Sequence, residues 1–441
     1  MAVSRSLSEP PARASAIAIG RPQSRGYILA LLTLVYTVNF VDRQVLPILL
    51  PAIKAEFHVS DTALGLLVGP TFAFFYAILG VPLAMLADRV SRRRLIGISL
   101  FLFSIVTLLC GVAAQFWHLV LARIGTGIGE AGTGPASQTI IADLYPPAER
   151  ARAQAIYAAG VNAGVLIAFA MGGVVAERFG WRAAFVVAGI PGLLLAILLL
   201  LTLEEPERGR ADPAPATPTP PAPPLTTVLK TLWADKAFRL AVIGGCTTCF
   251  TGYAVGGFFP TLLVRTHHMR LGEIGLAIAL IAGVGGGLAT YAAGHAADRL
   301  ARRDVRWYFR VPAIAALLPL PLAPLCFLSD NAAVALAASV PILSLTAAFI
   351  GPVVAIIQRL VPLRMRATAI AVLILVDSLV GLGLGPQFVG LVSDWLTPAL
   401  GANALGVAML ASMIGSALSA IAFLIGSRHL AAALDAAGSA E

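Results

Sequence analysis

Long runs of apolar residues recur along the whole chain and are separated by short polar segments. A helix needs about 20 mostly apolar residues to cross a bilayer. Twelve stretches reach about that length, near 27–50, 62–87, 95–115, 117–143, 150–177, 182–203, 238–264, 271–297, 307–328, 333–360, 367–393 and 402–426. The pattern therefore predicts an all-α membrane protein with twelve transmembrane helices.

A polar stretch between spans six and seven divides the spans into two sets of six. Glu204 to Pro224 reads EEPERGRADPAPATPTPPAPP, and a segment so rich in Pro and Ala is typical of an extended linker. The next residues, up to Arg239, predict a short helix on the membrane surface, anchored by Trp233. Its apolar face comprises Leu225, Val228, Leu229 and Leu232.

The composition excludes a water-soluble protein. Of the 441 residues, 58% are hydrophobic and 12% are charged, whereas soluble domains carry about 25% charged residues. The net charge of +9 does not indicate nucleic-acid binding, because the basic residues lie in short loops and not in one patch.

These loop charges predict the orientation instead, because cytoplasmic loops carry the excess of Lys and Arg. Assigning the loops alternately gives one side Arg89, Arg92, Arg93, Arg94, Arg150, Arg152, Arg299, Arg302, Arg303, Arg306, Arg364 and Arg366. The other side receives Lys54, Arg178, Arg182, Arg265 and Arg270. The first side is therefore predicted to be cytoplasmic, with both termini there, and we expect a monomer in the plasma (inner) membrane.

The predicted organisation has five parts. They are a disordered cytoplasmic tail (1–26), a six-helix bundle (27–203), the cytoplasmic linker with its surface helix (204–237), a second six-helix bundle (238–426) and a second cytoplasmic tail (427–441).

The two sets of six spans echo each other. An Asp-Arg pair followed by a basic cluster ends the second span of each set, in GVPLAMLADRVSRRR (80–94) and GHAADRLARR (294–303). At a shift of 216 residues, LYPPAERARAQA from Leu144 also aligns with LVPLRMRATAIA from Leu360. Corresponding loops are basic in both halves, which predicts parallel repeats with a binding site at their interface near the midplane.

Charged residues inside span one are the main candidates for function. The stretch YTVNFVDRQVLPILLP, from Tyr36 to Pro51, contains Asn39, Asp42 and Arg43. A charge at mid-bilayer costs about 2.5–3.5 kcal/mol and usually faces a cavity. Adjacent residues point about 100° apart on a helix, so Asp42 and Arg43 need separate partners. Asn39 is spaced to accompany either of them.

Span four offers those partners, because Arg123, Gly127, Glu130 and Gly134 share one helical face. We predict that Asp42 pairs with Arg123, while Glu130 faces the cavity. A buried carboxyl whose basic partner comes and goes takes up and releases a proton, so Asp42 and Glu130 are the predicted proton carriers. The alternative is a purely structural ion pair that locks span one to its neighbour.

Arg43 is the candidate anchor for an anionic head group, since a guanidinium binds phosphate well. The alternative is that Arg43 only tunes a carboxylate. Tyr36 and Asn39 are assigned with Arg43 and Arg123 as substrate-binding residues or charge partners. Asp377, at mid-span in span eleven, has no basic residue at comparable depth in the second half. It is either protonated and merely polar, or it lines the cavity.

Several other chemistries are excluded or disfavoured. HExxH and GxSxG motifs are absent, and no nucleophile–base constellation is visible, so we do not expect an enzyme. Cys246 and Cys249 have C-x-x-C spacing without a second ligand pair, which favours packing over metal binding. We expect no cofactor other than the proton as coupling ion.

The loop after span two resembles the gating signature of the major facilitator superfamily through Asp88, Arg89, Arg93 and Arg94. Ala84 and Ser91 stand where that signature usually has glycines. Arg123 in ARIGTGIGEAG is similar to the fourth-span signature. The resemblance implies that the Asp88 loop, and its echo at Asp298 and Arg299, latch one conformation. The alternative for both loops is topology alone.

Within the superfamily, NFVDRQVLPILLPAIKAEF, GIGEAG and LYPPAERARA resemble the Spinster group. That resemblance implies a proton-driven, alternating-access carrier of lysolipid-type substrates, including lysophospholipids or sphingosine-phosphate-like molecules. A proton-coupled carrier of small organic or sugar acids is the close rival, and a non-transporting sensor is a third hypothesis.

Overall fold

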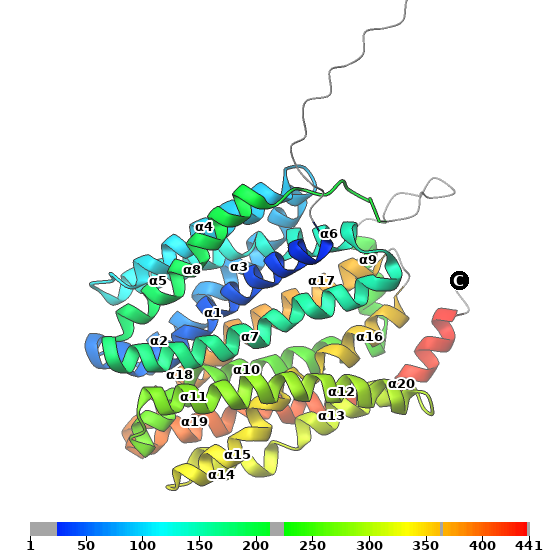
Figure 1. Cartoon of the computed structure of the whole chain (residues 1–441). Coiled ribbons are helices and arrows are strands. Elements are labelled where there is room, and N and C mark those ends of the chain that lie inside the picture. The colour runs from blue at the N-terminus through cyan, green and yellow to red at the C-terminus, as the bar shows by residue number, and fades with distance from the viewer. Residues whose placement is uncertain (1–23, 212–224, 362–364, 439–441) are drawn as a thin grey trace, which may run out of the picture.

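The computed structural model of the chain describes residues 24–211, 225–361 and 365–438, and every regular element in these ranges is helical (Figure 1). The first bundle comprises α1 (Arg25–Phe57), α2 (Asp61–Val68), α3 (Pro70–Ala87), α4 (Arg92–Cys110), α5 (Phe116–Glu130), α6 (Thr133–Leu144), α7 (Pro147–Phe179) and α8 (Trp181–Thr202). These helices match the first six predicted spans, with spans two and four each divided in two.

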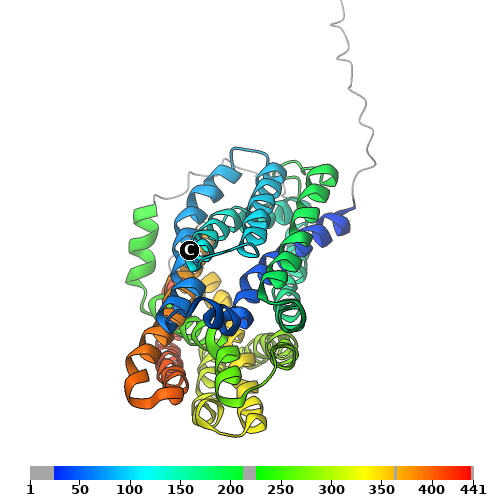
Figure 2. The same ribbon diagram turned by 90° about the vertical axis from the view of Figure 1, so that its left-hand side faces the viewer.

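The second bundle follows α9 (Leu225–Ala234) and supplies the other six spans. It comprises α10 (Lys236–His267), α11 (Leu271–Ile278), η1 (Ala279–Gly285), α12 (Gly286–Ala301), α13 (Trp307–Leu317), η2 (Leu320–Leu322), α14 (Ala323–Leu328), α15 (Ala332–Ser344), η3 (Leu345–Ala347), α16 (Ile350–Leu360), α17 (Arg366–Val376), η5 (Asp377–Leu384), α18 (Gly385–Leu400), η6 (Gly401–Asn403), α19 (Ala404–Ser412) and α20 (Ile414–Gly438). The end view shows the two bundles stacked one above the other (Figure 2).

Ten segments of the described chain are long and apolar enough to cross a membrane. One of them, Thr368–Ala431, contains predicted spans eleven and twelve together. Predicted span four is not among them, because it is divided into α5 of 15 residues and α6 of 12 residues. The predicted fold class is confirmed.

Little of the two predicted tails can be compared with the structure beyond where the first and last helices begin and end. Residues 1–23 of the predicted first tail lie outside the described residues, and α1 begins at Arg25. The last helix continues to Gly438, so most of the predicted second tail is helical. Residues 427–437 contain neither Gly nor Pro and include five alanines and two leucines, which favour helix continuation.

The predicted linker helix is present as α9, but it does not lie on the membrane alone. Val228 and Leu232 are buried in a cluster of the second bundle that includes Phe238 and Tyr308. Leu229 and Trp233 are exposed on the other side. The helix therefore joins the linker to the second bundle and leaves one apolar face for lipid.

Matching bonds in the two halves support the predicted parallel repeat. The guanidinium of Arg150 donates to the carbonyl of Tyr145 at 3.3 Å, and Arg366 donates to that of Val361 at 3.1 Å. Both pairs are related by the shift of 216 residues. The first helices of the halves, α1 and α10, also both end at a histidine in the left-handed region, His58 and His268.

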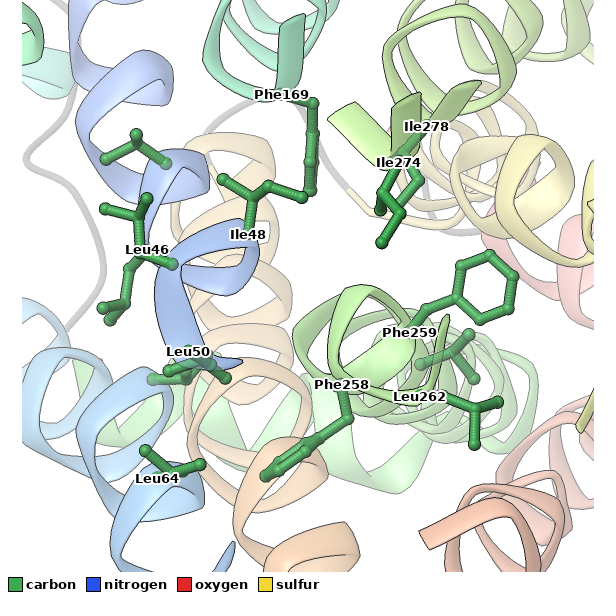
Figure 3. Packing of buried hydrophobic residues seen from close by; sticks show 14 of the residues in the cluster. Leu46, Ile48, Leu50, Leu64, Phe169, Phe258, Phe259, Leu262, Ile274 and Ile278 are labelled. Atoms are coloured by element: carbon green, nitrogen blue, oxygen red, sulfur yellow. The ribbon is translucent and has the colours of Figure 1, made fainter. Parts of the chain in front are cut away.

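The halves pack closely at the end that the loop charges predict to be extracellular. One buried cluster contains Leu46, Ile48 and Leu50 of α1, Leu64 of α2, Phe169 of α7, Phe258, Phe259 and Leu262 of α10, and Ile274 and Ile278 of α11 (Figure 3). Glycines allow this approach, since a methyl group on Gly69 would lie 2.8 Å from the carbonyl oxygens of Leu382 and Gly383. Contacts below 3 Å force something to shift, so the two backbones touch here.

Polar bonds also close the outer end. Asp61, at the start of α2, binds Arg265 of α10 at 2.5 and 2.7 Å and Lys54 of α1 at 2.6 Å. Ser393 of α18 donates to Asp61 at 2.7 Å. Asp394 accepts from the backbone N–H groups of Asp61 and Thr62. We call Asp61, Arg265 and Ser393 the outer latch, because they join the two halves.

Candidate functional site

Two buried ion pairs connect α1 to α5 at mid-span. Arg43 pairs with Glu130, and Arg123 lies 3.7 Å from Asp42. All four side chains are at most 9% exposed. Asp42 and Arg43 are neighbours on α1, and their partners are seven residues apart on α5. Neighbouring side chains on a helix point about 100° apart, so the two need separate partners. The predicted Asp42–Arg123 pair is confirmed, whereas Glu130, which we expected to face the cavity, is held by Arg43.

The two pairs differ in tightness. Arg43 donates a hydrogen bond to Glu130. Asp42 accepts a 2.5 Å bond from Thr107 of α4 at Oδ1, but its Oδ2 and the Nη1 of Arg123 have no hydrogen-bond partner in the described chain. A buried charge that lacks hydrogen bonds is destabilised. The Asp42–Arg123 pair is therefore the looser one.

Aromatic rings surround the guanidinium of Arg43. Its Cζ lies 5.0 Å from the ring centre of Phe40, 4.8 Å from that of Phe72 and 5.0 Å from that of Tyr76. Phe72 also lies 5.0 Å from the Cζ of Arg123, so this ring contacts both cations. Cation–π contacts of this kind hold a guanidinium in place without neutralising its charge. Tyr253 of α10 interacts electrostatically with Arg43 and brings the second half to the site.

Tyr36 and Asn39 pack or bond within the first bundle, and their predicted role as substrate-binding residues stays a prediction. The ring of Tyr36 stacks on Tyr157 of α7 at 4.4 Å and meets Phe40 edge-on at 5.2 Å. Asn39 donates a 2.6 Å bond to Thr133 of α6 and bonds neither Asp42 nor Arg43. Asn39 therefore joins α1 to the start of α6, just after the break in span four.

Asp377 lies where helical geometry changes in span eleven. It is the first residue of the π-helical segment η5, and such segments are rare and often occur at functional sites. Its Oδ1 is buried and has no hydrogen-bond partner in the described chain. A side chain on Gly245 of α10 would start 3.3 Å from that oxygen. No ion pair of Asp377 occurs among the described residues, which agrees with the sequence, and Asp377 does not bond Arg43 or Glu130 there.

Among the predicted gating residues of the first loop, Arg93 donates to a backbone carbonyl, that of Leu200 at the end of α8. Asp88 ends α3, and the carbonyls of this turn accept from Arg208, a residue of the linker. Arg89 and Arg94 are exposed. The first gating loop is therefore fastened to the linker, a partner that the sequence analysis did not predict.

The corresponding loop of the second half is held differently. Asp298 accepts a 2.9 Å bond from the Tyr308 hydroxyl, which in turn accepts from Arg359 at 2.9 Å. Arg299 is exposed. A tyrosine thus bridges α12, α13 and α16, and the latch expected at Asp298 and Arg299 stays a prediction.

A buried ion-pair network at the start of α4 was not predicted from the sequence. Arg92 is 3% exposed and pairs with Asp143 and with Glu205. Glu205 also accepts from the Ser91 hydroxyl and the Arg92 backbone, and Asp143 accepts from the Gly209 backbone. The first linker residues thus belong to the first bundle. The one sequence feature that indicated this network was the pair of acidic residues Glu204 and Glu205, directly after span six.

This network predicts a pH effect on stability. Burial acts to raise the pKa of Glu205, but hydrogen bonds from Ser91 and Arg92 outweigh it and lower the pKa below its usual value. The stabilisation is therefore fully present above the unfolded pKa of about 4.3 and is lost as the pH falls below it. We expect Glu205→Gln to lower the unfolding temperature at pH 7, with the difference from wild type shrinking toward pH 3.5.

Thermal unfolding of the purified full-length protein across this pH range measures the effect. Glu207→Gln is the matched control, because Glu207 is exposed and only two residues away. An equal effect of both substitutions at pH 7 would show that the Glu205 bonds do not stabilise the bundle.

Comparison with known proteins identifies the family. The family model described as Major Facilitator Superfamily matches residues 32–386. The chain belongs to the major facilitator superfamily. An "MFS-type efflux pump" of Mycolicibacterium smegmatis is 33% identical over 395 residues, which cover 88% of this chain and 89% of that protein.

The Spinster resemblance within the superfamily is also confirmed. The crystal structure of a bacterial homologue of the human lysosomal transporter Spinster, in an inward-facing and unoccupied conformation, has a TM-score of 0.86 and 31% identity. The match covers 94% of this chain and 99% of that one. A probable galactarate/D-glucarate transporter of Bacillus subtilis is 31% identical over 190 residues, 42% of either chain. These relatives are transporters, and the chain is an integral membrane transporter and not an enzyme.

Proposed function

We propose that this major facilitator protein is a proton-coupled secondary transporter that moves an amphipathic anionic lipid by alternating access. The observation that carries the proposal is the crossed pair of buried ion pairs, Asp42–Arg123 and Arg43–Glu130, beside an aromatic cluster. The Spinster resemblance supports the substrate class, lysophospholipid or sphingosine-phosphate-like.

Competition for Arg43 links the substrate to the proton. Glu130 is 3% exposed, and Arg43 is its ion-pair partner. When a substrate anion binds Arg43, Glu130 loses its countercharge. An unpaired buried carboxylate is strongly disfavoured, so Glu130 takes up one proton. One anion and one proton then occupy the site together, and release of either favours release of the other.

Asp42 provides the second proton position. Its pair with Arg123 is long and lacks a direct hydrogen bond. A small movement between α1 and α5 breaks it, and the carboxyl then takes up a proton while Thr107 remains its neighbour. The proton thus moves between two carboxyls that lie on different helices.

The surroundings of Arg43 suit an amphipathic anion. The guanidinium has donors for phosphate oxygens, and its Nε has no hydrogen-bond partner in the described chain. Phe40, Phe72 and Tyr76 give it an apolar rim. A phosphate head at Arg43 would leave the hydrocarbon chain against such rings.

A sugar-acid symporter is the second candidate. The Bacillus subtilis relative is named as a probable galactarate/D-glucarate transporter, and Arg43 would then bind a carboxylate. A polyol acid needs polar contacts from both halves. Beside Tyr253 on α10, Cys249 packs against Gly381 and Phe250 packs against Phe388, and neither side chain is a strong hydrogen-bonding partner for a polyol.

Transport into proteoliposomes tests the two candidates directly. Labelled lysophosphatidylglycerol and labelled glucarate are offered separately under an imposed pH gradient. Gradient-driven lysolipid movement supports the proposal. Movement of glucarate alone would replace the lipid by a sugar acid and leave proton coupling in place.

The proposed orientation has both termini in the cytoplasm, in the plasma membrane, with the protein acting as a monomer. The excess of arginines on one side supports this orientation. A membrane-impermeant thiol reagent should label a cysteine introduced at exposed Arg152 only after the cells are opened. Labelling in intact cells would reverse the orientation.

A further inference from the structure

A half-open hollow in the surface, called the cavity below, has a volume of about 470 Å³ and lies between the start of α4 and the end of α8. Its lining residues are Ser91, Arg93, Arg94, Leu200 and Glu205. It is separate from the Arg43–Glu130 site, which lies on α1 and α5. Because Arg93 and Arg94 lie in the first turn of α4, at the end predicted to be cytoplasmic, the cavity lies at the level of the inner leaflet.

The lining carries an excess of positive charge. Glu205 is engaged by the Ser91 hydroxyl and by Arg92, and Arg92 is engaged in turn by Asp143. Arg93 uses one donor nitrogen on the Leu200 carbonyl. Arg94 is exposed, and no ion pair of its guanidinium occurs in the described chain. Arg93 and Arg94 therefore face the cavity with unused hydrogen-bond donors. Glu205, the one carboxylate among the lining residues, already accepts bonds from Ser91 and Arg92.

Apolar side chains lead from the cavity along the membrane-facing surface. On α8, Leu201 is 76% exposed, and Leu198 and Leu194 follow it at one and two turns. On α4, Ile98 and Leu102 are also exposed. The two helices pack side by side, so these rows run parallel from the cavity toward the centre of the bilayer (Figure 1). The acyl chain of a lipid can contact these apolar rows, whereas a soluble anion has no apolar part to place against them.

We infer that this cavity binds the head group of an anionic phospholipid of the inner leaflet, with its acyl chains along α4 and α8. Arg93 and Arg94 contact the phosphate, and basic pockets between cytoplasmic helix ends are typical of such sites. The lipid is a bound partner, distinct from the transported substrate. It fastens α4 to α8 next to the Glu205 bonds.

Lipid titration of the purified full-length protein, read by native mass spectrometry, tests the inference. The probes are dioleoylphosphatidylglycerol and dioleoylphosphatidylcholine. Each basic residue near an anionic lipid contributes about fivefold in affinity, so we expect Arg94→Gln to weaken phosphatidylglycerol binding about fivefold and the double variant Arg93→Gln/Arg94→Gln about 25-fold. Binding of phosphatidylcholine should not change.

Arg152→Gln is the matched control, because Arg152 is an exposed cytoplasmic arginine outside the cavity. Wild-type phosphatidylglycerol affinity in Arg94→Gln overturns the inference, as does an equal loss in Arg152→Gln. Arg94→Gln decides the question if the double variant fails to fold, since the Arg94 side chain supports no described bond. Full displacement of the lipid by millimolar glycerol phosphate would assign the cavity to a soluble anion instead.

Discussion

Replacing Glu130 by Gln should abolish gradient-driven transport while leaving substrate binding intact. Gln keeps the shape of Glu130 and cannot take up a proton. It also leaves Arg43 without a competing carboxylate, so the substrate anion should bind at least as tightly as in wild type. We expect gradient-driven uptake to fall about 100-fold or more, the equivalent of about 3 kcal/mol for one broken buried pair.

Uptake into proteoliposomes under a pH gradient measures the first effect, and equilibrium binding in detergent measures the second. Glu149→Gln is the control, because Glu149 is an exposed acid at the cytoplasmic start of α7. Gradient-driven uptake above half of the wild-type rate in Glu130→Gln would show that Glu130 carries no proton.

Replacing Asp61 by Asn should open the outer end of the protein. Asp61 is buried, and its carboxylate binds Arg265 of the second half and Lys54 of its own half. Asn retains a partner for Ser393 but loses both ion pairs. The two cations are partly exposed, so the loss is smaller than for a fully buried pair. We expect the population open to the outside to rise about tenfold to thirtyfold, or about 1.4–2 kcal/mol.

Distances between two spin labels, measured by double electron–electron resonance, report this opening. Exposed Ala55 on α1 and exposed Ala399 on α18 carry the labels, in a chain whose four native cysteines are replaced. The control is Asp304→Asn, because the Asp304–Arg310 pair lies within the second half. An unchanged distance distribution in Asp61→Asn would mean that apolar packing alone holds the outer end closed.

Long apolar runs were sufficient to predict an all-helical membrane protein. Helices lie at each predicted span and at the predicted linker helix. The parallel repeat was also visible, because Arg150 and Arg366 occupy equivalent turns and make equivalent bonds. The break at Ala131–Gly132 and the π-helical segments η1 and η5 were not predicted. Both depend on packing against neighbouring helices, which composition does not report.

The candidate site was predicted in part. Helix geometry showed that Asp42 and Arg43 need separate partners and that α5 carries two of them. It did not show whether Glu130 faces Arg43 or the cavity, because a rotation of α5 by a few tens of degrees changes which of the two the side chain faces. The outer latch was missed for a different reason. Asp61 and Ser393 are 332 positions apart in the sequence, and Asp61 lies at a helix start, where an acidic residue is common.

Counting the protons that accompany the substrate tests the central claim most directly. Lysophosphatidylglycerol is added to proteoliposomes without a pH gradient, and a trapped pH-sensitive dye records the internal pH. The account predicts that lysolipid movement into the vesicles carries protons with it in wild type and that the pH change disappears in Asp42→Asn and Glu130→Gln. Lysolipid movement in wild type with no change in internal pH would contradict it.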